Sequence, residues 1–144
     1  MLTQHMSTLQ LRTPGRGLVE ITAMLRERIA GCGVRDGLAT LFLRHTSASL
    51  LVQENADAQV RRDLDNFFAR LVPDGDALFR HRSEGPDDMP AHVRSALTAT
   101  QIAIPVVDGH LALGTWQGVF VWEHRLQGHA RELVLHVLGE AATR

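Results

Sequence analysis

Residues 102–138 read IAIPVVDGHLALGTWQGVFVWEHRLQGHARELVLHVL, and this stretch decides the fold class. It holds four short apolar runs with strand character: Ile102 to Val107, Leu111 to Leu113, Gln117 to Arg125 and Arg131 to Leu138. The pair Asp108-Gly109 separates the first two, and such a pair between apolar runs is a hairpin signal. Neighbouring strands joined this closely pair antiparallel, because parallel neighbours need a longer crossover. The stretch therefore predicts an α+β fold with a largely antiparallel sheet, not a doubly wound α/β fold.

About three helices are expected before and beside these strands. Apolar residues recur at helical spacing over residues 18–30, which Gly31 and Gly33 would end: Leu18, Ile21, Leu25 and Ile29. A second helix starts near Asp57, and its apolar residues fall on one stripe: Val60, Leu64, Phe67, Phe68 and Leu71. Pro90 suits the first turn of a third helix that runs to about Ala99.

Further strands are expected over residues 6–13, 38–44 and 48–53, with Asp36-Gly37 as a turn. Residues 73–89 form a long polar loop. A loop of this length inside a compact domain is often functional.

Length and charge limit the class of protein. A chain of 144 residues predicts one domain, here 1–144. The net charge of -1 gives no field that favours nucleic acid or an anionic membrane surface. No apolar run approaches the roughly 20 residues of a membrane span, and the first residues lack the basic-then-apolar pattern of a signal peptide. Cys32 is the only cysteine, which is typical of a reducing compartment, so a cytoplasmic location is expected.

The densest chemistry lies in the long loop and just after it. His81 is followed by Glu84, the pair Asp87-Asp88 and then His92. Neutral imidazole is the usual ligand of zinc and similar divalent metals, and carboxylates can complete such a site or orient its imidazoles. The alternative for the two aspartates is to cap the helix that starts near Pro90.

A turn after the strand 38–44 carries His45, Thr46 and Ser47. Small hydroxyl residues in a turn can offer donors to a phosphate. For His45 the alternative is a strand-end histidine bonded to a backbone carbonyl. Glu54 and Asn55 follow the next strand and lead into the helix that carries Asp63.

The stretch Gly114 to Gly118 resembles a bulge or strand turn that allows close approach of a ligand. Its Trp116 is either a core residue or a ligand contact, and the amide of Gln117 could read a ring edge or a phosphate. Glu123 and Arg125 are two apart on a strand and share a face. They form either a structural ion pair or a binding site for an anion, since the arginine guanidinium can donate two parallel hydrogen bonds to a phosphate.

Taken together, these motifs resemble the YjbQ family, also known as the secondary thiamine-phosphate synthase family. The resemblance covers nearly the whole chain. It rests on ordered motifs: His-Thr-Ser-Ala at 45–48, Glu-Asn-x-Asp at 54–57, Met-Pro-Ala-His at 89–92 and Leu-Gly-Thr-Trp-Gln-Gly at 113–118. It implies a compact α+β trimer with a weak ability to join the pyrimidine and thiazole halves of thiamine.

The resemblance also implies a site, which we divide into three groups. The metal ligands would be His45, His81 and His92, with zinc as the expected ion and magnesium as the alternative. The catalytic acids would be Asp63, Asp87, Asp88 and Glu123. The substrate-binding residues would be Thr46, Ser47, Glu54, Asn55, Trp116, Gln117 and Arg125. The expected partners are a second and third copy of the chain and a small phosphorylated metabolite, with no nucleic acid and no membrane.

Two other functions stay open on the residues alone. A metal site of this composition would also serve a hydrolase of a small phosphate ester or amide. A trimeric module that binds a metal or metabolite without turnover is the third reading. The density of acids beside imidazoles in one loop favours an enzyme.

Overall fold

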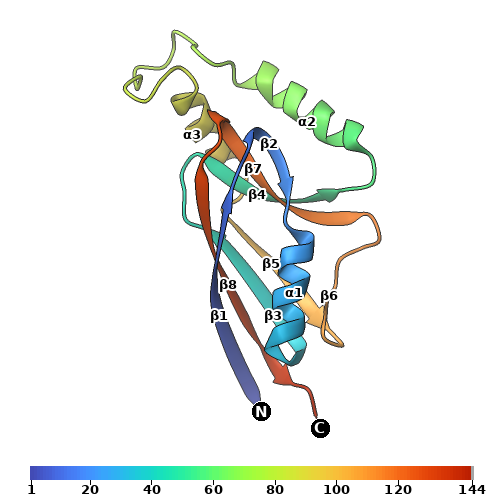
Figure 1. The fold of residues 1–144 in the computed structure, drawn as a ribbon. Coiled ribbons are helices and arrows are strands. Elements are labelled where there is room, and N and C mark those ends of the chain that lie inside the picture. The colour runs from blue at the N-terminus through green and yellow to red at the C-terminus, as the bar shows by residue number, and fades with distance from the viewer. Residues whose placement is uncertain (144) are drawn as a thin grey trace.

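The structure is a computed structural model that describes residues 1–143. Figure 1 shows its elements in chain order: β1 (Leu2–Arg12), β2 (Gly15–Glu20), α1 (Thr22–Cys32), β3 (Val34–Leu43), β4 (Ala48–Glu54), α2 (Ala58–Leu71), α3 (Asp88–Leu97), β5 (Gln101–Val107), β6 (His110–Leu111), β7 (Gln117–Gln127) and β8 (Ala130–Ala141). No helix of the described residues is long and apolar enough to cross a membrane.

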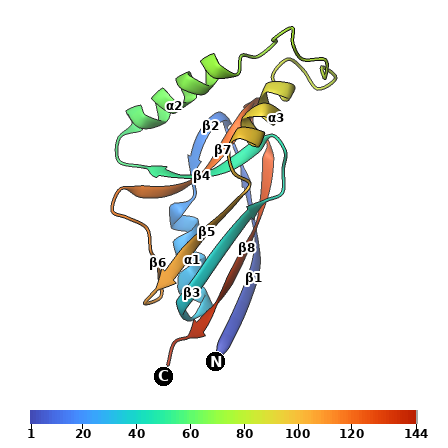
Figure 2. The same cartoon turned by 180° about the vertical axis from the view of Figure 1, so that it is seen from behind.

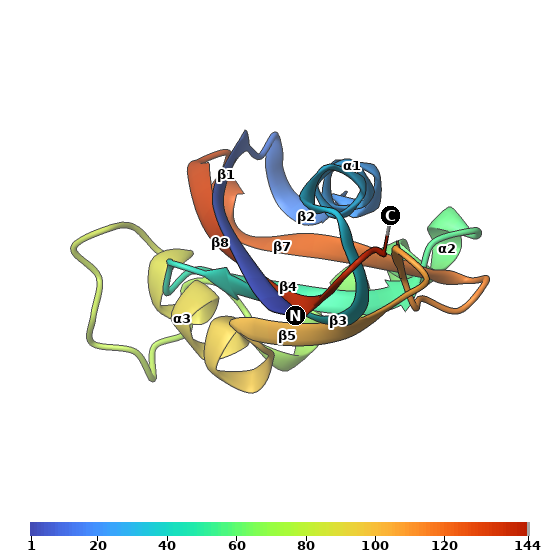
Figure 3. The same cartoon turned by 90° about the horizontal axis from the view of Figure 1, so that it is seen from below.

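The strands form two sheets, and every pairing between strands is antiparallel. The larger sheet has the order β1-β8-β3-β5-β6, and the smaller has the order β2-β7-β4. Seen along the strands in Figure 3, the larger sheet curves around the core and α1 closes one side. The predicted α+β class with antiparallel pairing is confirmed.

The core lies between the two sheets and α1. It contains alternate residues of the long strands, such as Leu133 and Leu135 of β8, and Leu25 and Ile29 from α1. Alternation is expected because successive side chains of a strand point to opposite faces. Among residues 1–143, no helix covers the opposite face of the larger sheet, which is seen in Figure 2.

Several local predictions are confirmed. Helix α2 starts after Asp57, whose carboxylate accepts a hydrogen bond from the backbone N–H of Gln59 at 2.8 Å. The Asp108-Gly109 pair joins β5 to β6 as a hairpin. Gly33 ends α1 in the left-handed conformation, with φ of 69°.

Two local predictions are wrong, for a common reason. Residues 18–20 belong to β2 and not to the helix, because they pair with β7, for example Val19 with Val121. Asp36-Gly37 is not a turn but lies inside β3, where Gly37 faces Gly139 of β8. A Cβ on Gly37 would lie 2.2 Å from the carbonyl oxygen of Leu138, so only glycine fits this close strand approach. Pairing with distant strands overrides the local pattern.

The apolar stripe of α2 is only partly covered, with Val60, Leu64 and Phe68 half-buried. None of its residues is buried. The helix meets the smaller sheet through Phe68, whose ring lies 4.6 Å from that of Trp122, and through Asp65, which accepts the Trp122 indole N–H at 2.9 Å. Phe67 and Leu71 of the apolar stripe remain 62% and 54% exposed.

Candidate metal centre

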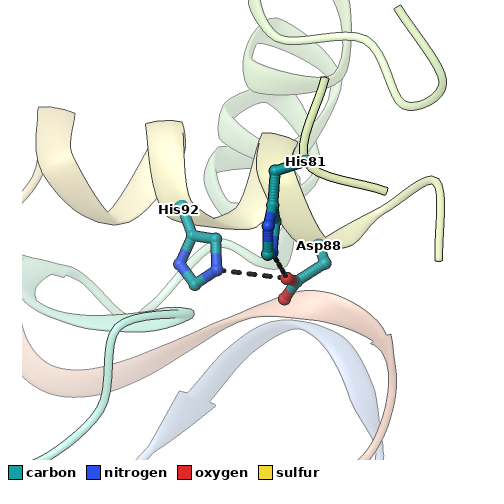
Figure 4. Close-up of side chains that lie close together, drawn as sticks. All are labelled: His81, Asp88 and His92. Atoms are coloured by element: carbon teal, nitrogen blue, oxygen red, sulfur yellow. Dashed lines mark hydrogen bonds and ion pairs between the residues drawn. The ribbon is translucent and has the colours of Figure 1, made fainter. Parts of the chain in front are cut away.

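The N-terminus of α3 and the preceding loop bring three potential metal ligands together. Asp88 and His92 are four residues apart, so they lie one above the other on one face of α3. The loop carries His81 to the same place. The Nε2 atoms of His81 and His92 lie 2.8 and 3.1 Å from the same oxygen, Oδ2 of Asp88. Figure 4 shows both rings converging on this carboxylate.

The hydrogen bond on the far side of the His92 ring decides which nitrogen can bind a metal. Nδ1 of His92 lies 2.8 Å from the backbone oxygen of Thr46, and because a carbonyl only accepts, Nδ1 must carry the proton. In the neutral ring Nε2 is then unprotonated, and its lone pair faces the carboxylate of Asp88. A lone pair beside a carboxylate repels it unless a proton or a cation lies between them. Such a backbone bond is how metal-binding histidines are commonly oriented.

Asp88 is held as a carboxylate. Its side chain is only 5% exposed. Burial by itself would raise the pKa of Asp88, but the hydrogen bond from His81 and the charges of His92 and Arg125 outweigh burial and lower that pKa. The site therefore keeps one negative charge over the physiological range.

Arg125 fixes the second oxygen of Asp88 and the neighbouring acid. Its guanidinium contacts Oδ1 of Asp88 at 3.0 Å, Oδ2 of Asp87 at 2.9 Å and the carbonyl of Glu84 at 2.8 Å. Asp87 makes no capping bond to α3, so the capping alternative does not hold for this residue. Arg125 directs its donors to the loop and to α3, not to solvent. Its role in this structure is to hold Asp88 in place.

Two residues in the second half of α3 fasten the helix to the start of β4 and to the end of α2. Ser95 donates to the carbonyl of Ala48 at 3.0 Å, and the buried Arg94 donates to the carbonyl of Val72 at 3.0 Å. A helix held at both points gives Asp88 and His92 a rigid base, which a precise ligand geometry requires.

The three side chains fit a divalent metal. Each of His81, Asp88 and His92 offers one ligand atom, and these atoms all lie within 4.8 Å of one another. Two imidazole nitrogens and a carboxylate oxygen are a donor set that zinc takes in proteins, with further positions left for water or substrate. This set forms a possible His-Asp-His metal-binding group.

Two clefts adjoin the group, and each shares one histidine with it. A loop cleft of about 430 Å³ is lined by His81 and by Phe79, Arg82, Pro86 and Met89. A second cleft of about 430 Å³ is lined by His92 and by His45, Thr46, Ser95, Thr98 and Thr100; we call it the hydroxyl cleft. Both volumes lie in the usual range for small-molecule sites.

His45 lies apart from the three grouped ligands. Its Nε2 accepts a hydrogen bond from the backbone N–H of Glu132 at 2.8 Å. The neighbouring Ser47 accepts bonds from Arg131 through both its hydroxyl and its carbonyl oxygen. Thr46 contributes its carbonyl to His92. The turn 45–47 therefore orients His92 of the His-Asp-His group through the carbonyl of Thr46.

Glu123 is fully buried and lines neither cleft. It forms an ion pair with Arg131 and accepts a hydrogen bond from Thr13 at 2.6 Å. Burial would raise the pKa of Glu123, but the bonds from Arg131 and Thr13 lower it. These contacts make Glu123 part of an internal polar network that joins β7 to β8.

The other expected substrate-binding residues lie at the opposite end of the smaller sheet. The strand pair β4–β7 runs from Ala48 opposite Glu123 to Glu54 opposite Gln117. Six residues of strand correspond to roughly 20 Å. Four residues gather at that far end: Glu54, Asn55, Trp116 and Gln117. Asp63 lies on α2 and accepts a bond from Gln59 at 2.7 Å. The structure does not bring these five side chains to His81, Asp88 and His92.

Sequence reasoning missed three participants. The acceptor that fixes His92 is a backbone carbonyl, which no side-chain pattern reveals. Arg131 and Thr100 reach the site region from β8 and from the segment after α3, and only the folded chain brings them there.

Comparison with known proteins places these features in a family. The family model described as "UPF0047 protein YjbQ-like" matches residues 7–140. The chain is 53% identical to UPF0047 protein sll1880 of Synechocystis over 137 residues, which cover 95% of this chain and 93% of that protein. It is 40% identical to UPF0047 protein YjbQ of Escherichia coli O157:H7, with 94% and 99% covered.

Solved structures agree in fold. A YbjQ-like protein of unknown function from Sulfolobus solfataricus superposes with a TM-score of 0.89 over 97% of this chain and all of that chain, at 20% identity. A conserved hypothetical protein of Thermus thermophilus, TT1486, gives a TM-score of 0.80 at 36% identity, with 90% and 97% covered.

Proposed function

The chain belongs to the UPF0047 YjbQ-like family, and from this premise we propose that it is a metal-assisted enzyme that joins a pyrimidine diphosphate to a thiazole phosphate, with release of diphosphate. The observation that carries the metal part is the orientation of His92. Its Nδ1–H donates to Thr46, so its Nε2 lone pair is presented to the position shared with His81 and Asp88. The activity part comes from the resemblance of the sequence motifs to the synthase family.

The reaction is a substitution at the methylene carbon of the pyrimidine. A thiazole nitrogen forms the new C–N bond as the C–O bond to the diphosphate breaks, and the diphosphate leaves with the electron pair. A zinc or magnesium ion held by His81, Asp88 and His92 would supply positive charge against the departing diphosphate.

The chain itself would provide position. Both clefts adjoin the three ligands, with His81 on the wall of the loop cleft and His92 on the wall of the hydroxyl cleft. A reaction that joins two molecules gains most from holding them together, and this can contribute several kcal/mol, roughly 7–11 in favourable cases. Arg125 supports this function by keeping Asp88 fixed and ionised.

The test is product formation by untagged protein that has been stripped with a chelator and then reloaded with zinc or with magnesium. We expect thiamine phosphate to form only after reloading, and His92→Ala to lose both bound metal and activity. His110→Ala is the matched control, because His110 is an exposed histidine on β6. A reloaded wild type that makes no product would refute the synthase proposal.

A hydrolase of a small phosphate ester or amide is the second candidate. The observation that favours it is the open position of the group: the His81 side chain is 48% exposed, so water reaches the ligands. A comparison of kcat/KM for phosphate esters and amides against that for the joining reaction separates the two. Tight zinc binding with no turnover in either assay would instead indicate a binding module.

We also propose that the protein is a homotrimer assembled through the larger sheet. The face of this sheet opposite the core exposes apolar side chains: Leu38, Phe42 and Leu138 are each 44% exposed, and Met6 is 67% exposed. They lie on adjacent strands, since Leu38 pairs with Leu138 and Met6 lies on β1. Apolar side chains exposed on one face of a sheet are typical of an interaction surface.

Light scattering after gel filtration tests this assembly. We expect three times the chain mass for the wild type and a smaller mass for Phe42→Glu. Leu78→Glu also replaces an exposed apolar side chain by Glu, but in a loop outside the sheet, and should leave the mass unchanged. A monomeric wild type would refute the trimer.

A further inference from the structure

His45 has a fixed tautomer that makes it a hydrogen-bond donor. Its Nε2 accepts the backbone N–H of Glu132 at 2.8 Å, so this nitrogen is unprotonated and its lone pair is occupied. In the neutral ring the proton is then on Nδ1. No acceptor among residues 1–143 bonds to Nδ1, and Nδ1 is not one of the buried polar atoms left without a partner, so it is open to solvent.

The surroundings keep this ring neutral. Burial and the charge of Arg131 lower the pKa of His45, and the nearby carboxylates of Glu123 and Glu132 oppose this only in part. At neutral pH the side chain therefore offers one N–H donor and no free lone pair. It is unsuited to metal binding as long as its bond to Glu132 persists.

The hydroxyl cleft beside His45 is rich in donors and free of acids. Its lining includes the hydroxyls of Thr46, Ser95, Thr98 and Thr100, and none of the residues that line it is Asp or Glu. Ser95 and Thr98 already donate to carbonyls of the chain. The hydroxyls of Thr46 and Thr100 make no hydrogen bond with the rest of the described chain, so both can donate to a ligand.

We propose that the hydroxyl cleft binds a phosphoryl group of the substrate and that His45 donates to it through Nδ1–H. An acceptor-rich group is the natural occupant of a recess with several neutral donors and no carboxylate. The proposal deepens the proposed function, on which its identification of the ligand as substrate rests. It assigns the phosphoryl end to this cleft and leaves the loop cleft, with Phe79, Pro86 and Met89 on its wall, for a ring.

The cleft adjoins the metal group through one shared residue. His92 lines the hydroxyl cleft, and its Nε2 faces Asp88. A phosphoryl group bound beside His45 would therefore lie next to the position where a cation is expected. This arrangement gives His45 a role different from that of a third metal ligand, which the family resemblance implied.

Calorimetry with inorganic phosphate on metal-free protein tests the proposal. Removing one donor to a charged ligand weakens binding by roughly 10- to 100-fold. We expect this loss in His45→Ala, a smaller loss in Thr100→Val, and unchanged affinity in the control His110→Ala. Zinc stoichiometry should be unchanged in His45→Ala and lost in His92→Ala.

Two further readouts keep the proposal refutable. Nitrogen-15 NMR of the imidazoles should show His45 protonated at Nδ1 in the wild type. If His45→Ala fails to fold, the phosphate affinity of Thr100→Val still tests whether the cleft binds phosphate. Loss of zinc in folded His45→Ala would make His45 a ligand and overturn the proposal, as would a wild type that does not bind phosphate. Because phosphate is measured on metal-free protein, a failure of zinc binding alone would count against the proposed function and not against the cleft.

Discussion

Stability should depend on pH through His124, a histidine buried beneath α2 and α3. Its side chain is fully buried, its Nε2 lies 2.8 Å from the hydroxyl of Ser49, and its Nδ1 has no partner. Burial, helped by the charge of Arg94, lowers the pKa of His124 from 6.5 to about 3. We therefore compare the stability of the wild type and of His124→Gln as the pH is lowered from 8 to 5.

The magnitude follows from the difference in proton binding between the two states. Between pH 6.5 and pH 3 the unfolded chain binds a proton at this position and the folded chain does not, so stability falls as pH falls. For pKa values of 6.5 and about 3, His124 alone should cost about 2 kcal/mol of folding free energy at pH 5 relative to pH 8. Carboxylates contribute little to the slope in this window, since unfolded Asp and Glu titrate at about 4.

The assay is urea unfolding at pH 8, 6.5 and 5, at one protein concentration and with a chelator present to remove any contribution from metal. Glutamine keeps a polar amide near Ser49 but cannot take up a proton. The stability difference between wild type and His124→Gln should therefore shift by about 2 kcal/mol in favour of the variant at pH 5. Equal pH dependence in the two proteins would show that His124 is not held neutral, and the reasoning would fail.

Three further outcomes are expected. Gly37→Ala should destabilise the protein by about 1–3 kcal/mol in urea unfolding, because the added Cβ meets the backbone of β8. Gly31→Ala in α1, where a Cβ has nothing within 4 Å, should be neutral or stabilise by up to about 1 kcal/mol. Equal effects of the two changes would contradict the close approach of β3 and β8. Glu123→Gln should cost about 3–5 kcal/mol of unfolding free energy, since it leaves Arg131 buried without its charge partner, and an unchanged Tm would refute that pairing. Asp88→Asn should weaken zinc at least about tenfold by competition with a chromogenic chelator, and unchanged affinity would remove Asp88 from the ligands.

Much of the local structure could be predicted because it depends on near neighbours. The start of α2 near Asp57 and the hairpin at Asp108-Gly109 are set by a few consecutive residues. The same is true of one pair in the site: Asp88 and His92 are four apart on a helix, so their proximity follows from helical geometry alone.

The remainder was decided by contacts between distant residues. Val19 joins a strand because β7 offers it a partner. Phe67 and Leu71 of α2 stay exposed because the helix meets the sheet through Asp65 and Phe68. Four motifs that the family resemblance grouped into one site are divided between two ends of a sheet, since strand register separates Glu54 and Gln117 from Ala48 and Glu123.

The fold class and the elements with local signals could therefore be predicted from the residues alone, as could the segment that carries the candidate metal ligands. The tertiary structure decided which imidazoles meet and which nitrogen each presents. His81 joins Asp88 only through the path of the loop, and the tautomers of His92 and His45 are set by the backbone groups of Thr46 and Glu132. The physical reason is that a proton on a ring nitrogen is fixed by its hydrogen-bond partner, and those partners lie tens of residues away along the chain.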